Sequence, residues 1–189
     1  MKTLLLLLVF LFVFSAVSAD ELEKFNNLRR GFAKSNAMPD MWELTYSKEL
    51  LDIASHIECP TKPGANWRFF YLAGGKNARD YDNFLVEWFK KFEKTNASVV
   101  TAQVKEWEKG TAYFLEYVNP IQTKLACVDK QCTIESTDLS IKINYRRMCL
   151  FGPNNNLGMT MPIDEKSGKV PGSKCGPNGK NNDGLCVPK

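Results

Sequence analysis

The six cysteines constrain the fold of this chain more than any other feature. They are Cys59, Cys127, Cys132, Cys149, Cys175 and Cys186. All of them follow an N-terminal segment in which Lys2 precedes the apolar run 4–14, and Val17 and Ala19 occupy the −3 and −1 positions of a cleavage site. This pattern is typical of a secretory signal peptide over residues 1–19. An even number of cysteines in an oxidising compartment predicts three disulfides, while spacing alone leaves all fifteen pairings open.

An uncleaved signal anchor is the alternative interpretation of the N-terminal run. A membrane-spanning helix needs about 20 apolar residues, and the run 4–14 is too short for one. Zinc is the alternative use of the cysteines, but the chain has no CxxC pair and a single histidine, His56. We therefore expect a secreted, extracellular protein that begins near Asp20, without a membrane span and without a cofactor.

The charge of the chain is modest and spread along its length. The formal net charge is +4, and loss of Lys2 with the signal lowers it to +3. Basic residues occur in runs of no more than two, and we expect these on solvated faces. The runs are Arg29-Arg30, Lys90-Lys91 and Arg146-Arg147. A nucleic-acid partner is not predicted, because recognition of phosphates requires a clustered basic surface.

Helical periodicity dominates the first part of the mature chain. The first predicted helix has an apolar stripe at spacings of three, three and four: Leu22, Phe25, Leu28 and Phe32. The adjacent Arg29-Arg30 pair is assigned to positions off this stripe. Ser47 is a candidate N-cap for a second helix that ends before Cys59. Further helices are predicted over about 82–92 and 99–107.

Later segments have the pattern of strands. Residues 67–72 form a short aromatic run, 125–128 are apolar, and 141–150 alternate between apolar and polar side chains. Helices followed by strands favour an α+β fold in one domain over residues 20–163. Residues 164–189 are rich in Gly, Pro, Lys and Asn. We expect them to form a short C-terminal extension that its two cysteines staple.

Several motifs occur together in the order and spacing of a known family. They are Asn27-Leu28-Arg29-Arg30, Met41-Trp42-Glu43-Leu44-Thr45-Tyr46, Thr123-Lys124-Leu125-Ala126-Cys127, Cys149-Leu150-Phe151-Gly152-Pro153-Asn154-Asn155-Asn156-Leu157-Gly158, Gly172-Ser173-Lys174-Cys175 and Gly184-Leu185-Cys186-Val187. The set resembles the CAP domain of the SCP/TAPS family of venom allergen and sperm-coating proteins, with the short cysteine tail of nematode members. The resemblance implies a three-layer α-β-α sandwich. It also implies the disulfides Cys59–Cys132, Cys127–Cys149 and Cys175–Cys186.

The family's central cleft is degenerate in this chain. Members with an intact cleft carry two histidines and two glutamates there, and some bind a divalent metal. The resemblance places Trp67, Lys91 and Tyr113 at or beside these positions, and no histidine follows Cys59. Because imidazole is the side chain that titrates near neutral pH and binds zinc well, metal-assisted or histidine-based catalysis is not expected at this cleft.

Three other features have both a functional and a structural interpretation. His56, on the second predicted helix, is interpreted as a surface or partly packed side chain rather than a lone catalytic base. Asn96 begins an Asn-Ala-Ser sequon and is a predicted glycosylation site. The aromatic side chains could line a lipid or sterol site, but we interpret them as core. They are Trp67, Phe69, Phe70, Tyr71, Trp88 and Phe92.

These observations predict a secreted protein without enzymatic activity that binds another extracellular protein. A lipid or sterol carrier is the second interpretation, and a hydrolase is the third.

Overall fold

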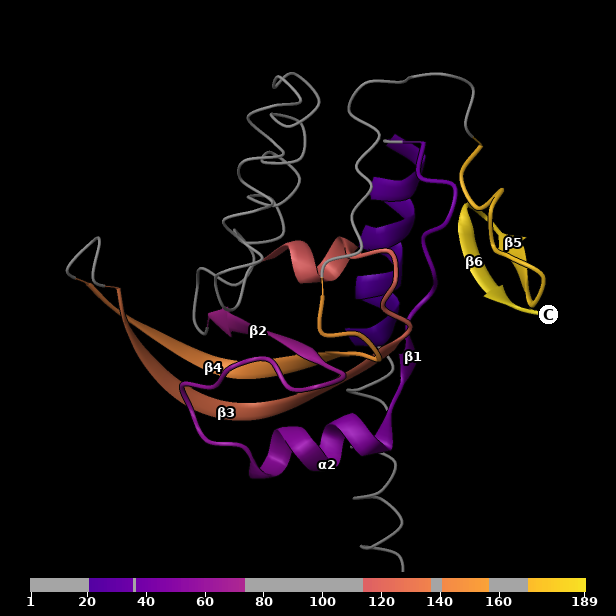
Figure 1. The fold of residues 1–189 in the computed structure, drawn as a ribbon. Coiled ribbons are helices and arrows are strands. Elements are labelled where there is room, and N and C mark those ends of the chain that lie inside the picture. Colours follow the sequence, from indigo (N-terminus) through magenta and orange to yellow (C-terminus); the bar gives the residue numbers. More distant parts are fainter. Residues whose placement is uncertain (1–20, 36, 74–113, 137–140, 157–169) are drawn as a thin grey trace, which may run out of the picture.

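The computed structural model describes residues 21–35, 37–73, 114–136, 141–156 and 170–189. Its centre is a four-stranded sheet in the order β1-β3-β4-β2 (Figure 1). The strands are β1 (Thr45–Tyr46), β2 (Arg68–Ala73), β3 (Lys124–Ser136) and β4 (Ile141–Gly152). Strand β4 is antiparallel to both β3 and β2, whereas β1 is parallel to β3.

Helices cover both faces of this sheet. Helix α2 (Lys48–His56) packs on one face, and the helix at 21–35 and the short 3-10 helix η1 (Phe114–Val118) lie on the other (Figure 1). Side chains of β2 alternate between the two sides: Phe69 belongs to the core under α2, and Phe70 to the core under the N-terminal helix. This arrangement confirms the predicted α+β class and the α-β-α layering.

The first two helices form where the sequence predicts them. Phe25 and Phe32 are buried, and Leu22 and Leu28 are partly buried against the same core. At α2, the Ser47 hydroxyl accepts a hydrogen bond from the Leu50 N–H at 3.3 Å. Such an N-cap satisfies a backbone donor that the first helical turn leaves free. The predicted apolar stripe and the predicted cap are both confirmed.

Arg29 contradicts the expectation that the Arg29-Arg30 pair is solvated. Its side chain is fully buried, whereas Arg30 is partly exposed. The Arg29 guanidinium donates five hydrogen bonds of 2.7–3.2 Å to four backbone carbonyls. These carbonyls belong to Trp42, Tyr117, Asn119 and Gln122. Arg29 is buried because carbonyls from two distant segments converge on it, which compensates for the loss of hydration. Burial lowers the pKa of Arg29 to about 9, so the group is charged at neutral pH.

A buried asparagine makes a second link between the N-terminal helix and the chain that follows it. Asn26 Nδ2 donates to the Leu44 carbonyl at 2.9 Å, and the Leu44 N–H donates to Asn26 Oδ1 at 2.8 Å. The amide thus satisfies both backbone groups of Leu44, as a neighbouring strand would. Together with Arg29, Asn26 fixes the position of the helix against the segment that leads into β1.

Strands β3 and β4 form a longer hairpin than the sequence indicates. The apolar segment 125–128 marks only the start of β3, which continues to Ser136 past a bulge between Asp129 and Cys132. In β4 the polar alternation is confirmed, because Lys142, Asn144 and Arg146 are exposed. Beyond the bulge, Cys132 is buried and Ile134 packs against the core under α2, whereas Thr133 is exposed. This stretch is too short to predict a strand from its pattern, and its pairing with β4 defines it.

Three disulfides tie these elements together. They are Cys59–Cys132, Cys127–Cys149 and Cys175–Cys186, the pairs that the family resemblance implies. The described residues contain no free cysteine. Cys127 and Cys149 are direct partners in the β3–β4 ladder. Cys59 joins the end of α2 to the distal part of β3.

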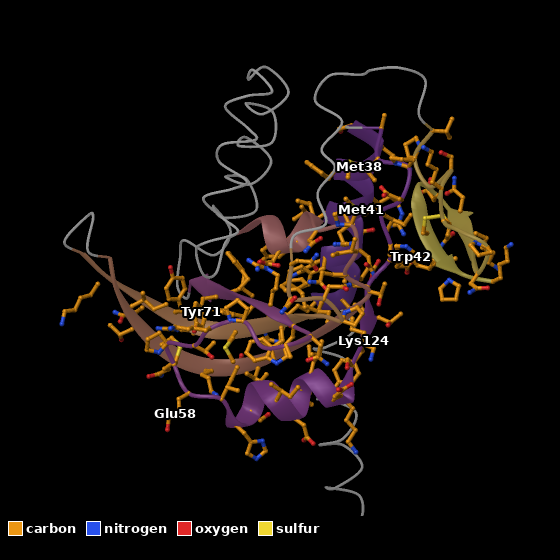
Figure 2. All side chains as sticks on the ribbon, in the orientation of Figure 1. Met38, Met41, Trp42, Glu58, Tyr71 and Lys124 are labelled. Atoms are coloured by element: carbon orange, nitrogen blue, oxygen red, sulfur yellow. A yellow bond between two sulfur atoms is a disulfide. The ribbon has the colours of Figure 1, made fainter. Side chains whose placement is uncertain are left out.

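The C-terminal tail docks on the domain and shares its core. Strands β5 (Gly179–Asn182) and β6 (Leu185–Pro188) form a hairpin, and Leu185 is fully buried within the core on the N-terminal helix side. The Cys186 N–H donates to the Met41 carbonyl at 2.7 Å. Trp42 lies beside this hairpin (Figure 2), and a Cβ at Gly179 would come within 2.8 Å of its ring. The tail therefore adds Leu185 to an existing core.

Some predictions fall outside the described residues. They include the helices at 82–92 and 99–107, the boundary near residue 163, and the solvated position of Lys90-Lys91. Within the described ranges, no helix has the length and apolar character needed to cross a bilayer.

Candidate functional site

Only some of the residues that the sequence singled out lie in the part of the chain that the structure describes. His56 is exposed on α2, with Nδ1 2.8 Å from the Asp52 carbonyl oxygen. This position agrees with a surface histidine. Lys91, Tyr113 and Asn96 lie outside the part of the chain that the structure describes.

Trp67 belongs to the core beneath α2. It is 8% exposed, its ring is 6.4 Å from that of Phe69, and the backbone of Gly64 lies directly against it. Phe69, Phe70 and Tyr71 are also buried. The interpretation of these four aromatic residues as core is confirmed, whereas Trp88 and Phe92 lie outside the described residues.

A buried ion pair occupies the opposite face of the sheet. Arg68 follows Trp67 on β2, so its side chain points to the other side, toward η1. Its Nε donates to Glu116 Oε1, and its Nη1 donates to the Asn155 carbonyl at 3.0 Å. Arg68 is 4% exposed and Glu116 is 1% exposed. The pair thus connects β2, η1 and the loop after β4.

The second carboxylate oxygen of Glu116 is the unusual feature of this pair. Oε2 is buried and has no hydrogen-bond partner among the residues that the structure describes. Desolvation raises the pKa of Glu116 to about 7, and Arg68 opposes this shift. Glu116 therefore changes its protonation near neutral pH, which is uncommon for a carboxyl group outside a functional site.

The sequence contains a signal for this pair. Arg68 is the one charged residue in the aromatic run 67–72, and Glu116 is the one charged residue in 114–118. A lone charge inside an apolar segment needs a partner when the segment is buried. Two such charges of opposite sign predict an ion pair between the segments.

The Gly-Pro-Asn-Asn-Asn loop after β4 is held against the segment that follows η1. Gln122 Nε2 donates to the Asn154 carbonyl at 2.8 Å, and the Asn154 N–H donates back to Gln122 Oε1 at 3.2 Å. Asn119 Nδ2 donates to the Asn156 carbonyl at 2.9 Å. These bonds place the Asn155 carbonyl where Arg68 reaches it. The motif thus fixes a rigid loop, as its turn-forming residues predict.

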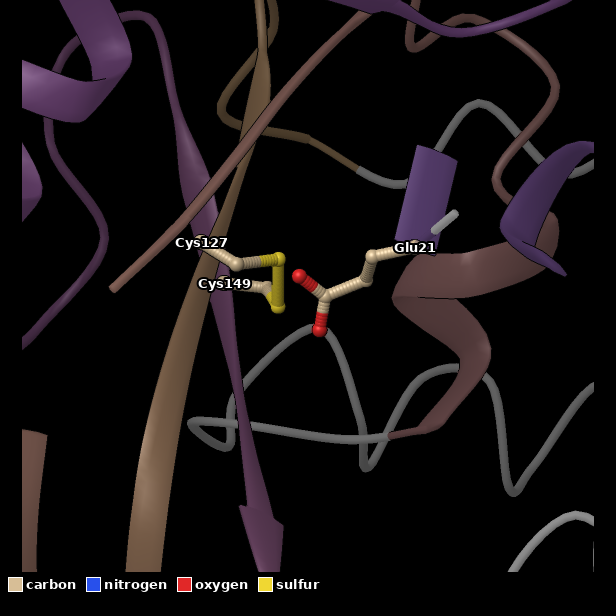
Figure 3. A group of neighbouring side chains, drawn as sticks. All are labelled: Glu21, Cys127 and Cys149. Atoms are coloured by element: carbon tan, nitrogen blue, oxygen red, sulfur yellow. A yellow bond between two sulfur atoms is a disulfide. The ribbon is translucent and has the colours of Figure 1, made fainter. Parts of the chain in front are cut away.

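One group of metal-ligand side chains lies within the described ranges. The ligand atoms of Glu21, Cys127 and Cys149 are within 4.8 Å of one another (Figure 3). The two sulfur atoms are bonded to each other, and a metal would need them as thiolates. One carboxylate remains, so this group does not fit a zinc ion, which needs at least three protein ligands.

Comparisons with known proteins find solved structures that resemble this fold, two of which are described below. No family model matches the sequence, and no curated protein does. Hookworm platelet inhibitor is 17% identical with a TM-score of 0.44, over 89% of this chain and 91% of that one. Na-ASP-1 is 18% identical with a TM-score of 0.39, over 87% of this chain but only 44% of that one. Both are CAP/SCP proteins. Both TM-scores are below 0.5, so neither likeness assigns a role to a residue of this chain.

Proposed function

We propose that the chain is a secreted CAP-type protein that binds another extracellular protein and has no catalytic cleft. The predicted signal at 1–19, the motif order and the three disulfides support secretion and the family. The packing of both sheet faces supports a rigid domain, which suits a binding module.

The position of His56 is the observation that supports a non-enzymatic role. It is the only histidine of the chain, and it is exposed on α2. The sheet separates α2 from η1, since the two elements pack into different cores. The imidazole therefore cannot assist Glu116, and Glu116 is engaged by Arg68. Covalent hydrolysis requires a nucleophile and a base within hydrogen-bond reach of each other. His56 and Glu116 do not form such a pair.

Exposed hydrophobic side chains are the candidates for a binding surface. Among the described residues, the exposed large hydrophobic side chains are Tyr46, at 47%, and Val170, at 59%. Tyrosine is enriched at the energetic centres of interfaces and valine is not. Tyr46→Ser and Val170→Ser are therefore a matched pair of exposed substitutions.

The test is a binding titration of the labelled mature protein on the cells or extracellular proteins that it meets after secretion. We expect saturable binding that protease treatment of the target abolishes, that Tyr46→Ser weakens about tenfold or more, and that Val170→Ser preserves. A stoichiometric lipid in solvent extracts of native material, without saturable protein binding, would establish a carrier instead. Ester or peptide hydrolysis that His56→Ala abolishes would establish a hydrolase.

A further inference from the structure

Three buried polar side chains hold the backbone of the loop that follows β4. The donors are Gln122 Nε2, Arg68 Nη1 and Asn119 Nδ2, which lie 2.8, 3.0 and 2.9 Å from the carbonyl oxygens of residues 154, 155 and 156, respectively. All three of these side chains are buried. Burial of a polar side chain costs free energy unless its hydrogen bonds are formed. The three bonds therefore fix the loop 153–156 in one position.

Asn154 takes part in this scaffold with its own side chain. Its Nδ2 donates to the Ile121 carbonyl at 2.9 Å, and its N–H donates to Gln122 Oε1 at 3.2 Å. The residue is partly buried. A loop that is already ordered loses little conformational entropy when it binds a partner. The loop is therefore suited to binding without rearrangement.

Asn155 and Asn156 point to a different use of the loop. Both are exposed, and among the described residues neither side-chain amide has a hydrogen-bond partner. The segment 153–156 has no charged residue, and the exposed large hydrophobic side chains of the described ranges are elsewhere, at Tyr46 and Val170. Asparagine supplies adaptable hydrogen bonds in the binding loops of antibodies. The loop thus offers a partner two neighbouring amides, each with a donor and an acceptor.

Another asparagine of this molecule shows what such an amide binds. Asn26 Nδ2 donates to the Leu44 carbonyl at 2.9 Å, and Asn26 Oδ1 accepts from the Leu44 N–H at 2.8 Å. One side-chain amide thus satisfies both backbone groups of one residue, in the segment that leads into β1. Two adjacent amides on a fixed loop can do the same for the backbone of another chain.

We propose that Asn155 and Asn156 bind the backbone of an extended peptide segment of the partner protein, an inference that rests on the proposed binding function. The amides take the place of a neighbouring strand for that segment. In this mode of recognition main-chain hydrogen bonds give the affinity, and side-chain pockets give the specificity. Since the loop has neither a charge nor an exposed large apolar side chain, we expect binding that depends on the peptide backbone and not on the peptide's charge.

The experiment selects ligands from a phage-displayed library of short random peptides on the immobilised mature protein with all disulfides formed. Enriched peptides are synthesised, and their affinities are measured for the wild type, for the double variant Asn155→Ala/Asn156→Ala and for Asn178→Ala. We expect the double variant to bind about tenfold more weakly, because it loses the amide hydrogen bonds. Methylation of a contacted backbone nitrogen in the peptide should weaken binding to the wild type in the same way, and affinity should change little with salt.

Asn178→Ala is the matched control and should bind the peptides as the wild type does. Asn178 is an exposed asparagine directly before β5, and its side chain has no hydrogen-bond partner in the described part of the chain. Alanine fits the backbone at all three positions, since positive φ among the described non-glycine residues occurs at Ala37 and Asp183. The methylated peptide tests the same contact on the unaltered protein, so its loss of affinity cannot come from a folding defect.

The proposal is overturned if no peptide is enriched, if the double variant binds the peptides as the wild type does, or if backbone methylation has no effect at any position. Binding to a glycan array that the double variant loses, without peptide binding, would assign the loop to carbohydrate and overturn the proposal as well. The selection does not use the secreted protein's natural target, so the proposed function is tested separately. Saturable binding to that target which the double variant retains would reject this inference and leave the proposed function in place.

Discussion

Replacing Arg29 with methionine should destabilise the protein far more than the same change at its neighbour Arg30. Methionine keeps most of the aliphatic stem of Arg29 and removes every donor. Four carbonyl groups then lose five hydrogen bonds, and three of these carbonyls are in buried contacts with the guanidinium. A buried acceptor without a donor costs about 1–3 kcal/mol. The Asn119 carbonyl keeps the Gln122 N–H as a donor at 3.3 Å. In the middle of this range, the buried carbonyls of Tyr117 and Gln122 together cost about 4 kcal/mol.

Arg30 is the matched control. Its Nε is 3.4 Å from Asp183 Oδ2, and the Asp183 side chain is 64% exposed. Exposed ion pairs contribute at most about 1 kcal/mol. Arg29→Lys should lie between the two methionine variants, because an ammonium has fewer donors and cannot span four carbonyls.

Urea unfolding of the disulfide-intact mature protein measures this difference. With a slope near 2 kcal/mol per molar urea, a loss of about 4 kcal/mol lowers the midpoint by about 2 M. Arg30→Met should lower the midpoint by no more than about 0.5 M. A midpoint for Arg29→Met within 0.5 M of the wild type, on the same approximate scale, would refute the claim that Arg29 holds these segments together.

Three further predictions concern covalent state and pH. The mature chain should take up no alkylating label without reductant, and peptide mapping should link Cys175 to Cys186; any labelled cysteine would contradict three complete bridges. Asn96 should carry glycan after eukaryotic secretion, so peptide-N-glycosidase should lower the mass, and an unchanged mass would argue against an exposed sequon. Glu116 has a pKa near 7 in the folded state against an ordinary value of 4.5, so its contribution to stability is complete below about pH 4.5 and is lost as the pH rises to about 7. Between pH 4.5 and 8, the free energy of unfolding should decline less in Glu116→Gln than in the wild type, by up to about 3 kcal/mol. An unchanged decline in the variant would show that other groups cause it.

The local parts of the fold were predictable because their signals are local. Helical spacing of apolar residues from Leu22 to Phe32 indicated the first helix, and Ser47 indicated where α2 begins. Alternation along 141–150 indicated which side of β4 meets solvent. Each of these patterns involves residues that are close together in the sequence, within a few helical turns or strand residues.

The burial of Arg29 differs from the position that its charge predicts. It lies four residues after Phe25 and three before Phe32, so helical geometry alone places it on the buried side. Its charge led to the opposite assignment. The carbonyls that satisfy it come from Trp42 and from 117–122, and only the folded chain brings them together.

The tail and the ion pair depend on long-range contacts in the same way. Leu185 is one apolar residue in a polar segment, and its burial follows from a neighbouring core that the tail does not itself provide. Arg68 and Glu116 are 48 residues apart. Each is visible in the sequence as a lone charge in an apolar run, but the choice of partner depends on how η1 packs against β2.

We infer that the protein acts by binding and that its cleft holds no catalytic metal. Isothermal titration of zinc into the deglycosylated mature protein is the direct test. Catalytic zinc needs three protein ligands and an open position for water, and the family resemblance places Lys91 and Tyr113 where glutamate and histidine would supply them. We predict no stoichiometric binding. Binding at micromolar affinity or better that Tyr113→Ala or Lys91→Ala abolishes would contradict the account.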